Sequence, residues 1–281
     1  MRTAVPQWPL GISTCAFGKL DERVFQAYGE IGALMEISLS PEECARLDWK
    51  AVPVYSARYG VPVRSFHLPF YPFEHNNLAS LDPAVRKETL ELHGSFVRRM
   101  SEARIPFAVV HPSGEPNREE DRPDMLNACA ESLYALAETA KPYGVTVCVE
   151  NLPRTCIGRD GSEIRFLADS HPDLRICFDV NHLLTESHEA FVRAVGEKIA
   201  SVHLSDYDFQ DEKHWLPGEG GIDWNELVDL LIGAGYDGPF LYEVPMRCPK
   251  TLPKPRRDLV LTDYARNYEA CLSGQPFPPI V

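Results

Sequence analysis

Four apolar segments in the second half of the chain each end in a side chain that can bind a metal ion. The segments are VTVCVEN, RICFDVNH, IASVHLSD and PFLYEVP, and the side chains are Glu150, Asp179, His203 and Glu243. Three carboxylates and one imidazole form an oxygen-rich ligand set, which suits Mn²⁺, Mg²⁺ or Co²⁺ and can also hold Zn²⁺. One such residue alone is usually a helix cap or a satisfied core side chain. Four at the same place in successive segments predict one divalent-metal site.

The elements that must position these side chains follow from the spacing. The segments recur about every thirty residues, which is the length of a strand, a crossover helix and two loops. Earlier apolar runs at residues 11–17, 34–40, 61–69 and 107–113 continue the series toward the N-terminus. Eight strand–helix units in 281 residues fit an α/β fold, the (β/α)8 TIM barrel, which commonly needs about 250 residues.

Domain organisation and helices are indicated by the residues between the apolar runs. No linker or low-complexity tract divides the chain, so we expect one domain over residues 1–281 with an extended tail at about 273–281. The clearest helices are expected at residues 82–100, 124–140 and 223–233, where capping or helix-breaking residues mark the boundaries. The segment 41–60 has the weakest pattern.

Strand alternation gives a separate test of the site, because side chains two residues apart share a face. If Glu150 and Asp179 point into the barrel, then Cys148 and Cys177 do so as well. The inward set is then small and polar, whereas outward residues such as Phe178 are bulky and apolar. That division favours a site at the carboxyl-terminal mouth of the barrel.

Composition restricts the partners. A formal charge of −13 and a pI of 5.2 disfavour electrostatic binding of nucleic acid. We find neither an apolar core of signal-peptide length nor a run of roughly 20 apolar residues, so we expect a cytoplasmic protein without a membrane span. The cysteines include no CxxC pair, which favours free thiols. The charged run 118–122 is expected to be an exposed approach to a helix.

A series of motifs resembles the xylose isomerase-like superfamily of TIM barrels, which includes sugar phosphate isomerases and epimerases and AP endonuclease family 2. The motifs are FHLP (66–69), VVHP (109–112), VEN (149–151), FDVNH (178–182), VHLSD (202–206), HWLPGEGGIDW (214–224) and YDGPFLYEVP (236–245). The resemblance implies that Glu150, Asp179, His203 and Glu243 bind one divalent cation. It also implies that Glu150 and Glu243 move protons to and from the substrate.

The reaction expected from this resemblance is isomerisation or epimerisation of a small sugar, ketose or keto-polyol. A cation on the carbonyl and neighbouring hydroxyl oxygens would acidify the adjacent C–H by stabilising the enediolate. One glutamate would remove the proton and the other would return it. The residues expected to contact the substrate are His182, His67, His111, His214, Asp206 and Trp215.

Several alternatives stay open. An inosose-type dehydratase would begin with the same proton abstraction. A zinc-dependent abasic-site nuclease that resembles endonuclease IV would hold three zinc ions and add His67, His111, His182, Glu212 and His214 to the ligand set, although Glu212 stands where an aspartate is expected. A sugar-binding barrel without turnover would lack one of the two glutamates, and both are present. Arg154 follows the Glu150 segment and could bind a phosphate or carboxylate, although no glycine-rich phosphate-binding loop accompanies it. The resemblance also implies that the chain could form a homo-oligomer.

Overall fold

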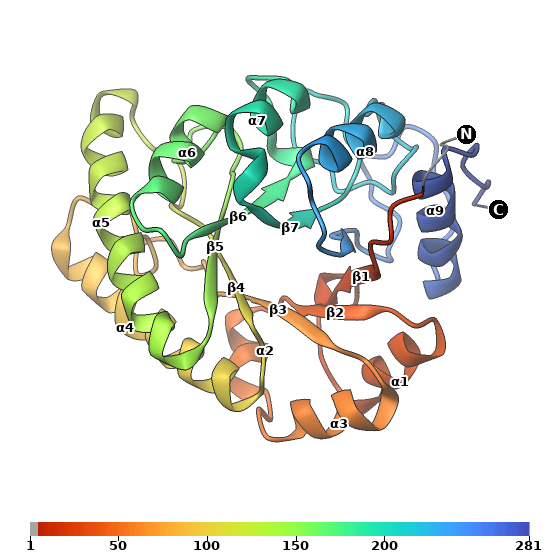
Figure 1. Cartoon of the computed structure of the whole chain (residues 1–281), viewed down its shortest axis with the longest axis horizontal. Coiled ribbons are helices and arrows are strands. Elements are labelled where there is room, and N and C mark those ends of the chain that lie inside the picture. The colour runs from red at the N-terminus through yellow and green to blue at the C-terminus, as the bar shows by residue number, and fades with distance from the viewer. Residues whose placement is uncertain (1–4, 281) are drawn as a thin grey trace.

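The computed structural model describes residues 5–280, which form a barrel of eight parallel strands surrounded by helices (Figure 1). The strands are β1 (Leu10–Ser13), β2 (Leu34–Ile37), β3 (Val63–His67), β4 (Phe107–Val110), β5 (Thr146–Glu150), β6 (Arg175–Asp179), β7 (Ile199–His203) and β8 (Phe240–Tyr242). The helices are α1 (Glu22–Glu30), α2 (Pro41–Arg46), α3 (Ala51–Tyr59), α4 (Pro83–Glu102), α5 (Arg122–Ala140), α6 (Gly161–Asp169), α7 (His188–Val195), α8 (Trp224–Gly233) and α9 (Leu261–Ser273). The predicted (β/α)8 barrel is confirmed.

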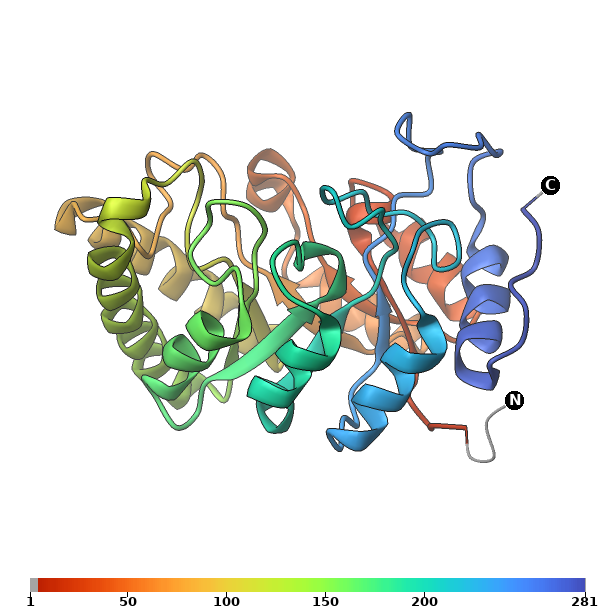
Figure 2. The same ribbon diagram turned by 90° about the horizontal axis from the view of Figure 1, so that it is seen from above.

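The strands follow one another around the barrel in chain order, and β1 also pairs with β8. The remaining edges, β7 and β8, meet through a parallel bridge between Leu204 and Tyr242. There the N–H of Leu204 donates to the carbonyl of Leu241 at 2.9 Å. In Figure 2 the blue loop between β8 and α9 projects on the side opposite the N-terminus.

Side-chain alternation divides the barrel into an interior and a helix-facing layer, as expected. Val109, Cys148 and Cys177 form a small buried cluster of their own. Val149 and Phe178 belong to the large cluster between strands and helices. The helix-facing layer therefore supplies most of the apolar burial, which leaves the interior free to carry polar side chains.

Local signals explain where the main helices begin. Asp82 accepts from the N–H of Ala84 at the start of α4, and Asp223 caps α8 in the same way. The segment 41–60, which had the weakest pattern, forms two short helices. The second ends at Tyr59 and is followed by Gly60, whose φ of 65° suits glycine. The expected strands ran too long: β1, for example, ends at Ser13 instead of residue 17, because the chain then turns into a loop at the barrel mouth.

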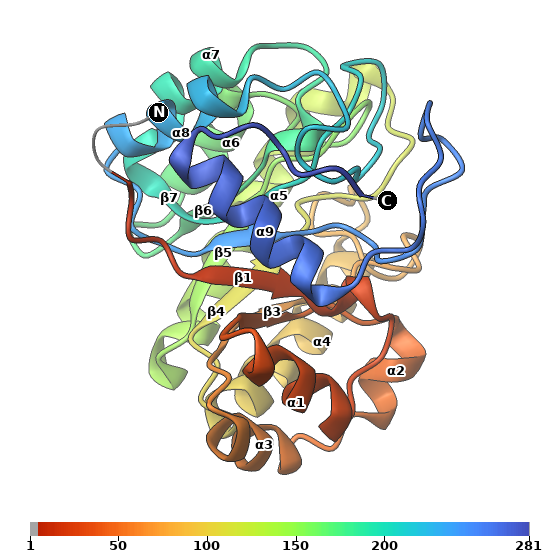
Figure 3. The same ribbon diagram turned by 90° about the vertical axis from the view of Figure 1, so that its right-hand side faces the viewer.

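The tail after α9 lies against its own barrel. Figure 3 shows α9 crossing over β1, with the chain continuing beyond it. The ring of Phe277 approaches Gly218 so closely that a Cβ there would lie 2.3 Å from it. The expectation of one domain over 1–281 stays a prediction, since it includes residues 1–4 and 281, which lie outside the described residues. Between residues 5 and 280, the structure has no helix with both the length and the apolar character to cross a membrane.

Candidate metal centre and substrate cavity

Four neighbouring strands deliver the predicted metal ligands to one place. Glu150, Asp179 and His203 are the last residues of β5, β6 and β7, and Glu243 directly follows β8. The pairing register sets Asp179 opposite His203. One ligand atom from each of the four residues lies within 4.8 Å of the others. The barrel thus brings together four residues that are spread over 93 positions of the sequence, from Glu150 to Glu243.

The oxygens of this cluster converge on one nitrogen of His203. Nδ1 lies 3.1 Å from Oε1 of Glu150, 3.4 Å from Oε2 of Glu243 and 3.8 Å from Oδ2 of Asp179. Oδ2 of Asp179 is buried without a hydrogen-bond partner. A buried carboxylate oxygen without a partner, beside two more carboxylates and an imidazole, is the donor set that a divalent cation requires. The residues present therefore fit a metal ion.

The electrostatics of the cluster point the same way. Burial, together with the Glu243 and Glu150 carboxylates, raises the pKa of Asp179 well above its usual range. Burial opposes ionisation of Glu150 as well, but His203 and His111 outweigh it and hold the pKa of Glu150 well below its usual range. Several carboxylates confined in one small volume need positive charge, which either imidazolium groups or a bound cation can supply.

Two further clusters adjoin the first. Nε2 of His67 lies 3.1 Å from Oε2 of Glu150, and Nε2 of His111 lies 3.5 Å from the same oxygen. On the other side, His182, Glu212 and His214 form a third group of converging ligand atoms. Glu150 belongs to the main cluster and to the His67–His111 cluster, and it forms a third group with Cys177 and His203. All of the ligands expected for a three-metal site are thus brought together.

A cavity of about 270 Å³ lies above these clusters. Phe70, Phe73 and Leu152 give it an apolar side, and the ring of Phe70 stacks on His111 with centroids 4.2 Å apart. The polar lining includes four of the expected substrate contacts, namely His67, His111, His182 and His214, together with Glu150 and Glu243.

Arg154, which also lines the cavity, is already bound by carboxylates. Its Nε donates to Glu115 at 3.0 Å, its Nη1 to Asp211 at 2.7 Å and its Nη2 to Glu212 at 3.1 Å. These carboxylates raise the pKa of the guanidinium further, with Glu115 contributing most. The expected role of Arg154 as a receptor for phosphate or carboxylate is at odds with this arrangement.

Two residues expected to contact substrate lie elsewhere. Asp206 is fully buried, and Trp215 is 2% exposed with its Nε1 donating to Thr251. The carboxylate of Asp206 accepts four hydrogen bonds from its own loop region, from the N–H groups of Tyr207, Gly218 and Ile222 and the indole of Trp224. Neither residue lines the cavity, so we remove both from the set of substrate contacts.

The charged run at 118–122 is also not uniformly exposed. Arg122 is 6% exposed and donates to both oxygens of Glu163 and to the carbonyls of Thr155 and Cys156. It therefore anchors the loop that carries Arg154, instead of facing solvent as the sequence suggested.

Sequence reasoning missed Glu36 and Glu115. Glu36 is a fully buried carboxylate in the barrel interior beside His203, and Glu115 holds Arg154. A signal for Glu36 was present, since a charged residue within the apolar run LMEI needs a buried partner. No comparable signal marked Glu115, which lies in a proline-containing loop.

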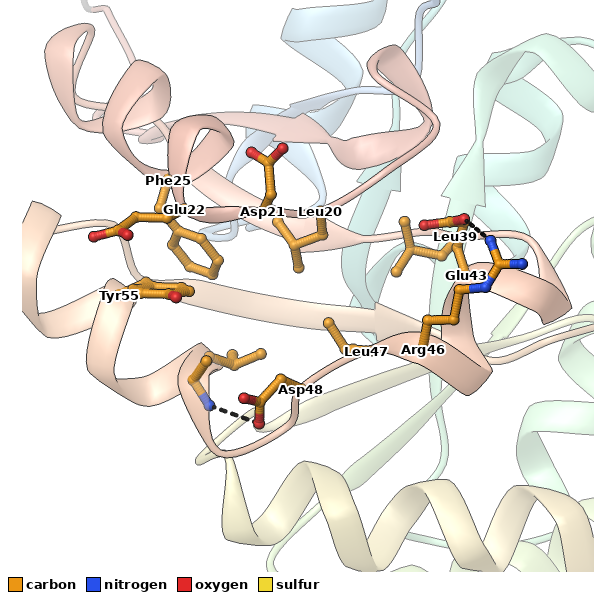
Figure 4. Close-up of a pocket in the computed structure, with 12 residues that line it drawn as sticks. Leu20, Asp21, Glu22, Phe25, Leu39, Glu43, Arg46, Leu47, Asp48 and Tyr55 are labelled. Carbon is orange, nitrogen blue, oxygen red and sulfur yellow. Dashed lines mark hydrogen bonds and ion pairs between the residues drawn. The ribbon is translucent and has the colours of Figure 1, made fainter.

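A second hollow, of about 210 Å³, lies between α1, α2 and α3 (Figure 4). Its apolar wall includes Phe25 and Tyr55. The carboxylates on its rim have structural partners: Asp48 accepts from the N–H of Ala51 at the start of α3, and Glu43 pairs with Arg46 at 3.1 Å. It has no converging set of ligands like the one at the barrel mouth, among the residues that the structure describes.

Comparisons with known proteins agree with the fold. A family model described as "Xylose isomerase-like TIM barrel" matches residues 44–263. A solved structure, a D-tagatose 3-epimerase-like protein, superposes with a TM-score of 0.74 at 23% identity, covering 93% of this chain and 94% of that one. At 23% identity, this structural similarity shows that the two proteins share a fold.

Three sequence relatives have names that point to different functions or to none. An uncharacterized protein of Methanocaldococcus jannaschii, MJ1311, is 31% identical over 176 residues, which is 59% of this chain and 60% of that protein. A probable endonuclease 4 of Thermoplasma acidophilum is 26% identical, over 62% of this chain and 64% of the relative. A D-psicose 3-epimerase of Ruminiclostridium cellulolyticum is 23% identical, over 64% of each. The matches thus span less than two thirds of these relatives.

Proposed function

Since the chain belongs to the xylose isomerase-like TIM barrel family, we propose that it is a divalent-metal-dependent isomerase or epimerase of a small sugar, ketose or keto-polyol. The observation that carries this proposal is the convergence of Glu150, Asp179, His203 and Glu243 at the base of a cavity of sugar size. The D-psicose 3-epimerase relative supports the reaction class. An inosose-type dehydratase would use the same first step and is the nearest alternative.

The two glutamates differ in their surroundings, which suggests different duties. Both oxygens of Glu150 face imidazoles, of His67 on one side and His203 on the other, and its side chain is 1% exposed. The side chain of Glu243 is 14% exposed and lines the cavity. The His203 and His111 imidazoles hold the pKa of Glu150 well below its usual range, so we assign the first proton abstraction to Glu150. We assign the return of a proton to Glu243, which lines the cavity and can take up a proton there.

The proposed chemistry begins at a C–H next to the substrate carbonyl. The C–H bond breaks, its electron pair enters the developing enediolate, and the proton goes to a carboxylate oxygen of Glu150. A bound divalent cation supplies electrostatic stabilisation of the negative charge on the substrate oxygens. Glu243, which takes up a proton from solvent in the cavity, then delivers it to the opposite face of the same carbon, which gives an epimer. Delivery to the neighbouring carbon gives an isomer instead, and the hydroxyl proton of the substrate then passes to the former carbonyl oxygen.

The cavity walls suit a neutral polyol. A sugar presents one face of C–H groups and an edge of hydroxyl groups. Phe70 and Phe73 offer an apolar side for the first, and His182 and His214 offer nitrogens that can bond the second. This division orients a substrate so that its reacting carbons lie between the two glutamates.

Solvent-deuterium exchange tests the proposal. Wild-type protein loaded with Mn²⁺ should incorporate deuterium from D₂O into a converted ketose. The Glu243→Gln and Glu150→Gln variants should each lose about 10²–10⁴-fold in rate. Asp263→Asn, a buried carboxylate at the start of α9, is the matched control and should keep full exchange. Exchange at the wild-type rate in both glutamine variants would contradict the mechanism, provided that all proteins contain metal.

A second candidate is favoured by one specific observation. His67, His111 and Glu150 form one additional ligand cluster, and His182, Glu212 and His214 form another. Three adjoining clusters suit the three zinc ions of an endonuclease IV-type abasic-site nuclease, and one relative is a probable endonuclease 4. The net charge of −13 argues against binding a polyanion.

Metal stoichiometry separates the two candidates. Elemental analysis of protein purified without added metal should give about one divalent ion per chain for the isomerase or epimerase, following from its single four-residue ligand set. Three zinc ions per chain, with cleavage of an abasic-site duplex, would establish the nuclease instead.

A further inference from the structure

A buried carboxylate lies behind His203, on the side away from the cavity. Glu36 belongs to β2, is fully buried and does not line the cavity. Its Oε2 accepts a hydrogen bond from Oγ of Ser65 at 2.7 Å, and its Oε1 lies 3.0 Å from Nε2 of His203. The direct contact of Glu36 with the proposed metal centre is therefore the imidazole of His203.

The two nitrogens of His203 face different partners. Nδ1 faces the oxygens of Glu150 and Glu243, where the cation is proposed to bind. Nε2 faces Glu36 alone among the carboxylates within 4.0 Å in the described part of the chain. A nitrogen that ligates a metal must be without its proton, and the neutral ring then carries its proton on the other nitrogen. A carboxylate at that other nitrogen is the usual device for fixing the tautomer and orientation of a ligand histidine.

From this geometry we propose that Glu36 is a positioning residue, which fixes His203 as an Nδ1 ligand by accepting a hydrogen bond from its Nε2–H. The inference rests on the proposed metal site. In the structure, Oε1 and Nε2 face each other without an aligned hydrogen bond, and both atoms are buried without another partner. We assign the alignment of this hydrogen bond to the metal-bound state, because burial leaves each atom no alternative partner.

The strand register explains how Glu36 is held in place. Glu36 and Ser65 are register partners in β2 and β3, so the serine hydroxyl meets the carboxylate across adjacent strands. Ser65 and His67 are two residues apart in β3 and therefore share its inward face. One strand thus supplies the anchor for Glu36 and a histidine of the neighbouring cluster.

Metal affinity of the apo-protein is the first test. Competition with a chromophoric chelator gives the dissociation constant for Zn²⁺ in the wild type and in Glu36→Gln, which keeps the size of the side chain but removes its charge. We expect Glu36→Gln to bind about 10–100-fold more weakly. Asp263→Asn, which also removes a buried carboxylate, should bind as the wild type does. Equal affinity of Glu36→Gln and the wild type would overturn the role of Glu36 and leave the metal site standing.

The tautomer of His203 is the second test. A purely structural role of Glu36 would leave the position of the His203 ring proton unchanged. In Zn²⁺-loaded protein with ¹⁵N-labelled histidine, His203 should carry its proton on Nε2, and that proton signal should shift in Glu36→Gln. The signal is identified by its loss in His203→Ala. Coordination through Nε2, or an unmoved signal, would overturn the inference. Wild-type protein that binds no divalent ion would instead refute the proposed metal site, and this inference with it.

Ser65→Ala keeps the test decisive if Glu36→Gln does not fold. It removes the hydroxyl that anchors Glu36 without changing any charge. A weaker affinity for Zn²⁺ together with a shifted Nε2 proton signal would support the positioning role. Wild-type values for both would overturn it.

Discussion

His182 and Glu212 face each other across the cavity wall, with Nε2 of His182 3.2 Å from Oε2 of Glu212. The other oxygen of Glu212 accepts from Arg154, which also binds Glu115 and Asp211. This chain of contacts joins the loops that follow β4, β5, β6 and β7. The positive charge of Arg154 is therefore balanced within the protein, and its donors already have acceptors.

If the proposed reaction is correct, we predict that the protein prefers a neutral ketose to its phosphate monoester. A phosphate brings nearly two negative charges at neutral pH into a cavity that is rich in carboxylates, and Arg154 could bind it only by releasing some of its present partners. We expect kcat/KM for the neutral sugar to exceed that for the ester by about tenfold or more, equivalent to about 1.4 kcal/mol. Steady-state kinetics on a matched pair of substrates will measure the ratio. A preference for the ester would mean that Arg154 exchanges its carboxylates for phosphate.

The ligand assignment predicts which variants lose metal. Asp179→Asn replaces one ligand oxygen with an amide, and His203→Ala removes the only nitrogen of the four-residue cluster. Both should reduce bound metal to well below one ion per chain after dialysis, whereas Asp206→Asn should retain it. Metal analysis by mass spectrometry gives the answer. Wild-type stoichiometry in both ligand variants would place the metal elsewhere.

Asp206 is predicted to matter for folding and not for turnover. Its carboxylate organises the loop after β7 through four donors, and an amide nitrogen in Asp206→Asn would face at least one of them. We expect a loss of about 1–3 kcal/mol in the free energy of unfolding. The kcat of the folded fraction should stay at the wild-type value, as followed by denaturant titration beside an activity assay. A selective loss of kcat at unchanged stability would restore Asp206 to the reacting centre.

The main cluster could be predicted from the sequence because a parallel barrel aligns the carboxyl ends of its strands. Once Glu150, Asp179 and His203 were placed at strand ends, the fold required them to meet. Asp206 shows where that reasoning stops. Three residues beyond the end of β7 the chain folds back, and Asp206 pairs antiparallel with Trp215, so alternation along the strand no longer tells which way its side chain points.

The sequence also did not predict interactions between residues that lie in different loops. Arg122 reads as part of an exposed charged run, and only the approach of Glu163, 41 residues later, makes it a buried anchor. Arg154 likewise depends on Glu115 from a different loop. Such pairings follow from loop conformation, which no periodicity in the sequence records.

A pH dependence of stability is predicted from His93, which lies in α4. Its Nε2–H donates to the carbonyl of Pro69 at 3.1 Å, while Nδ1 is buried without a partner, so a second proton there would have no acceptor. Burial lowers the pKa of His93 to about 4, below the value of about 6.5 for an unfolded chain. Between these values the unfolded state binds a proton that the folded state does not, so stability falls as pH drops from 6.5 to 4 and this contribution levels off below 4. The loss in the free energy of unfolding should approach about 3 kcal/mol.

The variant His93→Gln tests this prediction, because it keeps a donor and cannot titrate. In urea unfolding, the free energy of unfolding should differ less between pH 7 and pH 4 for this variant than for the wild type. Equal differences in the two proteins would show that His93 takes no part in the acid sensitivity.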